Sequence, residues 1–263
     1  MPGAALPPLI VAVGAAAWIM ALTAAVARRQ GVMLGWGGLA LATNPLAIFW
    51  MPVIVALSIG RRVPARLWPI APLSFLGATI LLRIAAWPTP DFAAIYLGQA
   101  GRSPAMAMDA PNIWAIVLAL PWIGELPLAG LAIAATLGAS AWFIAHFAWR
   151  PPAGSEVIAA GLLSALVAAG LLPGMNHESF FMAGILALML AVMRGGRWSW
   201  MIFALIATGS MLGLLGHFTD IKACAIVGAV PMIVATVLIA RRFLVSPAND
   251  NGLPLNLFRA YPA

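Results

Sequence analysis

Most of the side chains that could do chemistry in this chain lie in two short clusters and one longer polar segment. The first cluster is Asn176-His177-Glu178, in which an imidazole beside a carboxylate could bind a phosphate or relay a proton. The second cluster runs from His217 to Lys222, where pairing of Asp220 with Lys222 is the simpler interpretation. The longer segment, residues 88–112, holds Asp91, Arg102, Asp109 and Asn112.

These residues also have structural explanations. Asp109-Ala110-Pro111 is typical of a helix start, with the aspartate as cap and the proline in the first turn. His177 and Glu178 can equally cap the next helix and meet solvent. Arg83 can extend to the membrane surface, or it can hold an anionic head group in an aqueous cavity. We favour capping for Asp109 and surface extension for Arg83.

The sequence offers no recognisable metal or nucleotide motif. It has three histidines and one cysteine, without His-x-x-x-His spacing, a phosphate-binding glycine loop or a serine nucleophile elbow. His146 could ligate a haem or a chlorophyll-like pigment, but a lone helical histidine more often hydrogen-bonds to a neighbouring helix. We therefore expect no metal, haem or pigment.

The composition is that of a membrane protein. Of the 263 residues, 63% are hydrophobic and 8% charged, and the mean hydropathy is +1.02, which excludes an ordinary soluble globule. The formal charge of +7 comes from basic residues scattered as pairs between apolar runs, which argues against nucleic-acid binding. The expected partners are membrane lipids and other integral-membrane proteins.

The apolar runs predict an all-α, polytopic transmembrane helix bundle. A hydrocarbon core of about 30 Å needs about 20 helical residues, and this criterion selects seven spans. They are residues 5–27, 67–87, 126–149, 157–173, 180–193, 198–216 and 223–240. The transmembrane domain is predicted to cover residues 1–242, and residues 243–263 are predicted to form a short cytoplasmic tail.

The distribution of lysine and arginine predicts the orientation, because cytoplasmic loops are enriched in both. With the amino terminus outside and the carboxy terminus inside, Arg83, Arg102 and Lys222 lie outside. The remaining basic residues lie inside: Arg28, Arg29, Arg61, Arg62, Arg66, Arg150, Arg194, Arg197, Arg241, Arg242 and Arg259. The outer face is therefore where the polar clusters are expected.

Two apolar segments do not fit a simple crossing. Residues 31–60 begin and end beside arginine pairs that belong on the same side, and Asn44-Pro45 lies near their centre. Because proline disfavours helix at the residue before it, a broken, re-entrant helix pair is expected, and a kinked packed helix is the alternative. Residues 113–124 are too short to cross and predict a helix at the outer surface.

Three segments carry a family resemblance. The turn from Gly174 to Phe181 (GMNHESFF) resembles a Gly-Met-His-Glu-Arg-Tyr-Phe-Phe turn, and Asn112-Ile113-Trp114 resembles an Asn-Leu-Trp motif at the end of an outer loop. Residues 38–49 (GLALATNPLAIF) are similar to a Gly-Leu-Ala-Leu-x-Thr-Lys-Pro-Gln-Ala-Ile-Phe stretch. All three patterns belong to bacterial GT-C superfamily glycosyltransferases, which are related to mannosyltransferases. The likeness covers most of this chain but corresponds only to the carboxy-terminal part of a family member.

The resemblance implies inverting sugar transfer from a polyprenyl-phosphate donor, with an acidic base in the first outer loop. That loop would precede residue 1, and no aspartate or glutamate occurs ahead of Asp91. Polar positions of the motifs are changed as well: Asn44 and Leu46 replace the lysine and glutamine, and residues 176–179 replace His, Glu, Arg and Tyr. The candidates that remain for binding a lipid phosphate or substrate are Arg83, Arg102, Asn112, Asn176, His177 and His217.

These changes lead to three functional hypotheses. The first is a non-catalytic integral-membrane subunit or scaffold derived from a GT-C module, since the apolar positions survive and polar ones are lost. The second is a lipid-linked sugar transferase on the periplasmic face of a bacterial inner membrane, split from its amino-terminal half or using Asp91, Asp109 or Glu178 as its carboxylate. The third is a lipid or small-solute transporter that uses the break at Asn44-Pro45.

Overall fold

The computed structural model describes residues 8–85, 110–120, 123 and 128–245. Helices and their connecting turns make up this part of the chain, which contains no strand. In chain order the elements are α1 (Pro8–Val26), α2 (Gln30–Thr43), η1 (Pro45–Phe49), α3 (Met51–Gly60), η2 (Ala65–Leu67), α4 (Ile70–Ile84), α6 (Ile113–Val117), α7 (Leu128–Trp149), α8 (Ser155–Leu171), η3 (His177–Phe180), α9 (Phe181–Arg194), α10 (Arg197–Thr219) and α11 (Lys222–Val245).

The predicted all-helical membrane protein is confirmed at this level. Among the described residues, 5 helical stretches are long and apolar enough to cross a membrane. They are Ala65–Ile84, Leu128–Trp149, His177–Arg194, Arg197–Thr219 and Lys222–Leu244. The predicted spans 5–27 and 157–173 overlap α1 and α8, apolar helices of 19 and 17 residues.

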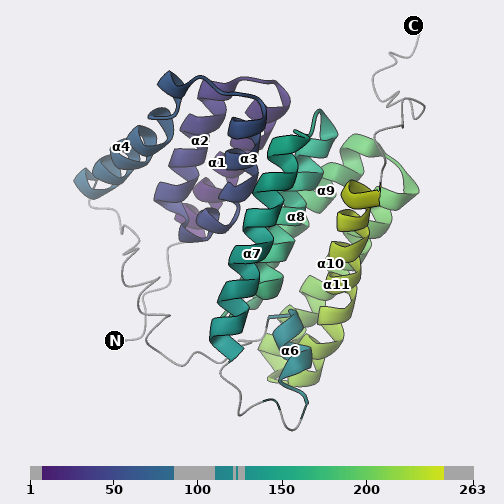
Figure 1. Ribbon diagram of the computed structural model, residues 1–263. Coiled ribbons are helices and arrows are strands. Elements are labelled where there is room, and N and C mark those ends of the chain that lie inside the picture. The colour runs from purple at the N-terminus through teal and green to yellow at the C-terminus, as the bar shows by residue number, and fades with distance from the viewer. Residues whose placement is uncertain (1–7, 86–109, 121–122, 124–127, 246–263) are drawn as a thin grey trace, which may run out of the picture.

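Helix α8 is the centre of the bundle (Figure 1). Every residue from Val157 to Leu166 is buried, and α8 contacts α1, α3, α7, α9 and α11. After Ser155 and Glu156 in its first turn, its sequence is apolar on all sides apart from Ser164. A helix without a polar face is stable only where other helices surround it, which accounts for its position.

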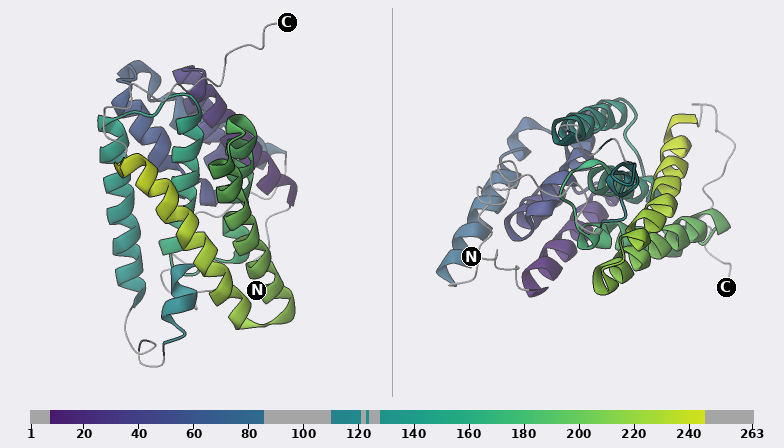
Figure 2. Two further views of the ribbon diagram at one scale, coloured as in Figure 1. Left: turned by 90° about the vertical axis from the view of Figure 1, so that its right-hand side faces the viewer. Right: turned by 90° about the horizontal axis from the view of Figure 1, so that it is seen from below.

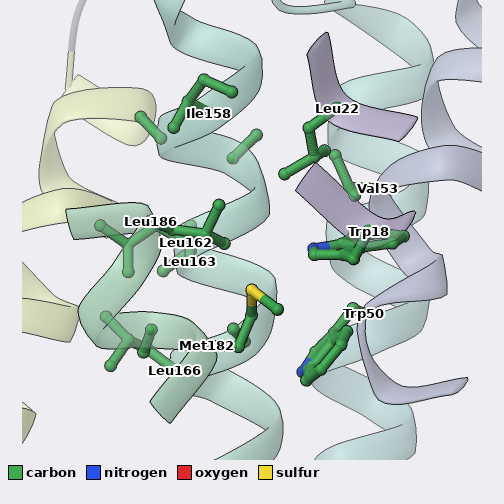
Figure 3. Packing of buried hydrophobic residues seen from close by; sticks show 14 of the residues in the cluster. Trp18, Leu22, Trp50, Val53, Ile158, Leu162, Leu163, Leu166, Met182 and Leu186 are labelled. Atoms are coloured by element: carbon green, nitrogen blue, oxygen red, sulfur yellow. The ribbon is translucent and has the colours of Figure 1, made fainter. Parts of the chain in front are cut away.

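The core joins the amino-terminal helices to α8 and α9. Figure 3 shows Trp18 and Leu22 of α1, Trp50 and Val53 at the start of α3, Leu162 and Leu166 of α8, and Met182 and Leu186 of α9. The rings of Trp18 and Trp50 lie 5.7 Å apart between centroids, tilted by 44°. This pair fixes α1 against the start of α3 by burial of two large aromatic surfaces.

The chain breaks at Asn44, as the sequence predicts. Helix α2 ends at Thr43, and the buried Asn44 caps η1 by accepting a hydrogen bond from Leu46 N at 3.0 Å. At the other end of η1, the carbonyl of Phe49 accepts from Ser164 Oγ of α8 at 3.3 Å. The Asn44 side chain is therefore occupied in satisfying the backbone of the break.

Both ends of segment 31–60 lie at the same end of the bundle. Arg61, directly after α3, donates from Nη1 to the carbonyl of Ala25 in α1 and from Nη2 to the carbonyl of Pro152, at 2.5 and 2.8 Å. Burial, and secondarily the charge of Arg28, lowers the pKa of the Arg61 guanidinium from its ordinary value. One side chain thus ties together α1, α3 and the connection between α7 and α8.

Helix α4 lies at one edge of the bundle, opposite α10 and α11 (Figure 2). It packs chiefly against α2 and has no buried residue. Ser74 Oγ donates to Gly35 O at 2.7 Å, and a Cβ at Gly38 would overlap with Ala71 O. Only glycine at position 38 lets the two backbones approach this closely.

One predicted boundary is wrong. The surface helix predicted for residues 113–124 is the five-residue α6, which ends at Val117, and Trp114 and Ala115 within it are buried against the bundle. Helix α11 continues to Val245, and the cytoplasmic tail from residue 243 stays a prediction. Residues 246–263 lie outside the described part.

We expect Arg61→Met to destabilise the fold by about 2 kcal/mol, because it leaves the carbonyls of Ala25 and Pro152 without their charged donor. Thermal unfolding in detergent should show a melting temperature lower by about 4–8 °C. The matched control is Arg62→Met, since Arg62 is the exposed neighbour of Arg61. Equal shifts for both variants would contradict the structural role of Arg61.

Candidate functional site

The two predicted polar clusters meet at one end of the bundle. His177 lies in η3 between α8 and α9, and His217 lies in the last turn of α10. Their imidazole rings are 4.4 Å apart between centroids and tilted by 32°. His217 is exposed and His177 is partly buried, so the pair lies at the surface.

Asn176 holds the turn that contains His177. Its Oδ1 accepts from Ser179 Oγ at 3.0 Å, and its Nδ2 donates to Glu178 Oε2 at 3.3 Å. Glu178 is exposed to solvent. These bonds join three side chains of the turn to one another, and Asn176, the N-cap residue of η3, makes no side-chain capping bond to the backbone.

Helix α6 docks beside this end of the bundle. Asn112 is its cap: Asn112 Oδ1 accepts from Ala115 N at 3.2 Å, so the helix start predicted at Asp109 is three residues too early. Trp114 Nε1 donates to Leu171 O, in the last turn of α8, at 2.7 Å. The Asn-Ile-Trp segment and the Gly174–Phe181 turn are therefore neighbours, joined through the end of α8.

An apolar pocket of about 160 Å³ lies between α6, α8 and α11. Its lining consists of Pro111, Asn112, Ile113, Leu166, Val167, Gly170, Leu171, Phe180, Met232, Ile233, Thr236 and Val237. Thr236 Oγ1 donates to Met232 O of its own helix at 2.8 Å. Asn112 is therefore the one amide in an otherwise apolar wall, and it is 1% exposed.

Of the remaining candidates, Arg83 is described by the structure and is not brought into this arrangement. Asp91, Arg102 and Asp109 lie outside the described residues. Arg83 is exposed in the last turn of α4, at the edge of the bundle. Within the described ranges, no group of three or more His, Cys, Asp or Glu side chains could hold a metal ion.

His146 packs near the end of α7 and makes one contact with α11. Its ring stacks on Trp142 of the same helix, 5.1 Å between centroids and 21° from parallel. It also meets the ring of Phe147 edge-on at 5.0 Å and forms a hydrogen bond with the backbone of Phe243 in α11. These contacts join the end of α7 to the end of α11.

The pocket could not be predicted from the sequence, because its walls come from distant segments. Met232, Ile233 and Thr236 of α11 resemble ordinary residues of an apolar span. The local signal lies on the other wall, where Asn112 is a polar residue directly before an apolar run. Asn112 is among the candidates from the sequence, but nothing in the sequence indicates its burial.

We expect Trp114→Phe to loosen α6, because phenylalanine keeps the ring and removes the hydrogen bond to Leu171 O. The loss of one hydrogen bond, about 1 kcal/mol, should speed amide exchange in residues 113–118 about fivefold. Hydrogen–deuterium exchange with mass spectrometry measures this. The control Trp200→Phe changes an exposed indole on α10 and should leave these amides unaffected. Unchanged exchange in Trp114→Phe would contradict the anchoring role.

A scan against protein-family models, a search of curated proteins and a search of solved structures each found no match for this chain. Function is therefore argued from the geometry of the chain itself.

Proposed function

We propose that this chain is a non-catalytic subunit of a membrane protein complex, derived from a GT-C glycosyltransferase module, which binds another integral-membrane protein through one face of α7. The observation that carries this proposal is a row of small, exposed residues along that helix. They are Gly130, Ala134, Gly138, Ala141 and Ala145. Steps of three and four residues place all of them on one side of the helix.

Among the described residues, none packs against this small-residue face. A Cβ added at Gly130 or Gly138 would meet nothing within 4 Å. Elsewhere small residues mark helix contacts: a Cβ at Gly209 of α10 would lie 2.8 Å from Gly228 O of α11. The chain thus uses glycine for close helix packing, and α7 carries a similar surface without a partner.

The shape of the face suits a helix. Exposed large residues flank the row on both sides, Leu131 and Trp142 on one and Ile133 and Leu137 on the other. A groove of small residues between two ridges lets a second helix approach closely. In a membrane, exposed apolar side chains already contact lipid tails, so no hydrophobic force drives helices together. Helix association therefore depends on such close packing. The proposed partner is accordingly an apolar transmembrane helix.

The proposed topology has seven crossings, with 31–60 as a re-entrant pair and the amino terminus in the periplasm. Support comes from the basic residues at one end of the bundle. Arg61 contacts Pro152 beside α8, and Arg194 Nε donates to Ser155 Oγ at the start of α8 at 3.0 Å. The Arg242 guanidinium lies 4.8 Å from the ring centre of Trp198. A basic end of this kind faces the cytoplasm in inner-membrane proteins.

We expect Ala134→Leu to weaken the complex at least about tenfold, because the larger, branched leucine side chain would separate helices that pack through the groove. Blue native electrophoresis of mild detergent extracts measures the fraction of chain in the complex. The matched control is Ala135→Leu, an exposed alanine of the same helix outside the row, which should stay within about twofold of wild type.

A wild-type chain that migrates as a monomer would contradict the proposal. Equal effects of the two leucine substitutions would contradict it as well, because the groove would then have no specific occupant.

A second candidate function, sugar transfer, is favoured by one observation. Two of the three segments that resemble GT-C motifs lie together, linked by the hydrogen bond from Trp114 to Leu171 O. In that reading Glu178, or a carboxylate outside the described residues, would act as the base and His177 with His217 would face the phosphate. The donor would be a polyprenyl-phosphate sugar.

The subunit proposal predicts that the purified chain transfers no sugar from a polyprenyl-phosphate donor, measured by mass spectrometry of glycolipid products. Transfer by wild type that falls about a hundredfold or more in Glu178→Gln would instead establish the second candidate. The control Glu156→Gln changes a carboxylate at the other end of α8 and should leave any transfer unchanged.

A further inference from the structure

We propose that the pocket between α6, α8 and α11 binds one acyl chain of a membrane diacyl lipid, with the Asn112 amide donating a hydrogen bond to the ester carbonyl. This site is separate from the small-residue face of α7, and it does not depend on which partner or activity the chain has. The argument rests on the size and polarity of the pocket and on one buried amide.

The pocket accepts an apolar group. Its volume of about 160 Å³ is close to that of cavities, about 150 Å³, that stay dry and bind benzene-sized molecules. Its lining has no charged side chain. Val237, on its rim, is 49% exposed on the surface of α11. A lipid tail can therefore enter from the membrane side and fill the space with several methylene groups.

Asn112 supplies the polar contact. Its Nδ2 has no hydrogen-bond partner, and water cannot serve as one because the residue is only 1% exposed. The orientation of the amide is fixed, because Oδ1 accepts from Ala115 N, and a flipped amide would place two donors together. Two N–H groups are thus left unpaired on a residue that lines an apolar pocket. A buried donor without an acceptor is costly, so a ligand acceptor is expected there.

The position of Asn112 is imposed by its neighbours. Pro111 packs against α11, where a Cβ at Gly228 would lie 3.1 Å from Pro111 Cβ, and Trp114 is bonded to Leu171 O of α8. The segment is held on both sides of Asn112. The amide therefore stays at the pocket and is not displaced to solvent.

The acceptor must be neutral and attached to an apolar chain. A phosphate would bring its charge into a wall that has no cation, which is unfavourable in an apolar medium. Water would fill only part of a space that is otherwise lined by hydrocarbon. The ester carbonyl of a diacyl lipid meets both requirements, since it is an uncharged acceptor that adjoins a long alkyl chain.

The test is photolabelling in nanodiscs of phosphatidylglycerol in which a fraction of the lipid carries a diazirine on one acyl chain. Peptide mass spectrometry locates the label. We expect enrichment in peptides that contain residues 166–171 or 232–237 of the wild-type chain. Gly170→Leu fills the pocket, because a Cβ there meets nothing within 4 Å, and it should lower this labelling at least fivefold. Val237→Trp should also lower this labelling at least fivefold, because it obstructs the exposed rim of the pocket and changes no core residue.

Matched controls are Gly184→Leu on α9, where a Cβ also meets nothing within 4 Å, and Val234→Trp, an exposed valine one turn away on α11. Both should stay within about twofold of wild type. Asn112→Ser keeps a capping oxygen and removes the amide donors, so labelling should fall about fivefold, as for the loss of one hydrogen bond.

Two outcomes would overturn the proposal. One is labelling of the pocket peptides that is the same in Val237→Trp and Val234→Trp, which would indicate general exposure to lipid. The other is loss of the label when an equimolar short-chain quinone or a polyprenyl phosphate is added, which would assign the pocket to a different class of molecule.

Discussion

The structure depends on one constraint: inside an apolar medium, every backbone N–H and C=O group has to find its partner within the protein. Regular helices meet the requirement by themselves. At several places where the described chain departs from a helix, a side chain supplies a partner for the backbone. Asn44 caps η1, Ser164 reaches the carbonyl of Phe49, and Arg61 serves the carbonyls of Ala25 and Pro152.

The same constraint explains what the sequence could predict. Apolar runs of about 20 residues predict helices, and Asn44-Pro45 predicts the break, because both signals are local. Arg61 could not be assigned from sequence, since its acceptors lie 36 and 91 residues away. The sequence placed His177 and His217 on one face of the membrane, but their 4.4 Å approach depends on how α9 and α10 pack.

The polar side chains of the candidate site differ in how their hydrogen-bonding atoms are used. Asn176 and Glu178 satisfy one another and the turn in which they lie, which is sufficient reason for their presence. Asn112 differs, because its oxygen is used for capping while its nitrogen has no partner. An unsatisfied donor in an apolar wall is the feature that fold maintenance alone does not explain. The unpaired Asn112 amide supports lipid binding at this position rather than catalysis.

Small residues also occur in two situations. At Gly38 and Gly209 they let backbones of this chain pack closely, as at Ala71 O and Gly228 O. Along α7 the same kind of residue faces outward, between ridges of large side chains. Membrane helices that carry such faces associate through them.

The most direct test of this account is a cryo-electron microscopy map of the chain purified with its native partners in a mild detergent. We predict a transmembrane helix of another protein that crosses α7 over Gly138, with the two helix axes about 8 Å apart or closer. Density for lipid or detergent alone along the face from Gly130 to Ala145 would contradict the account.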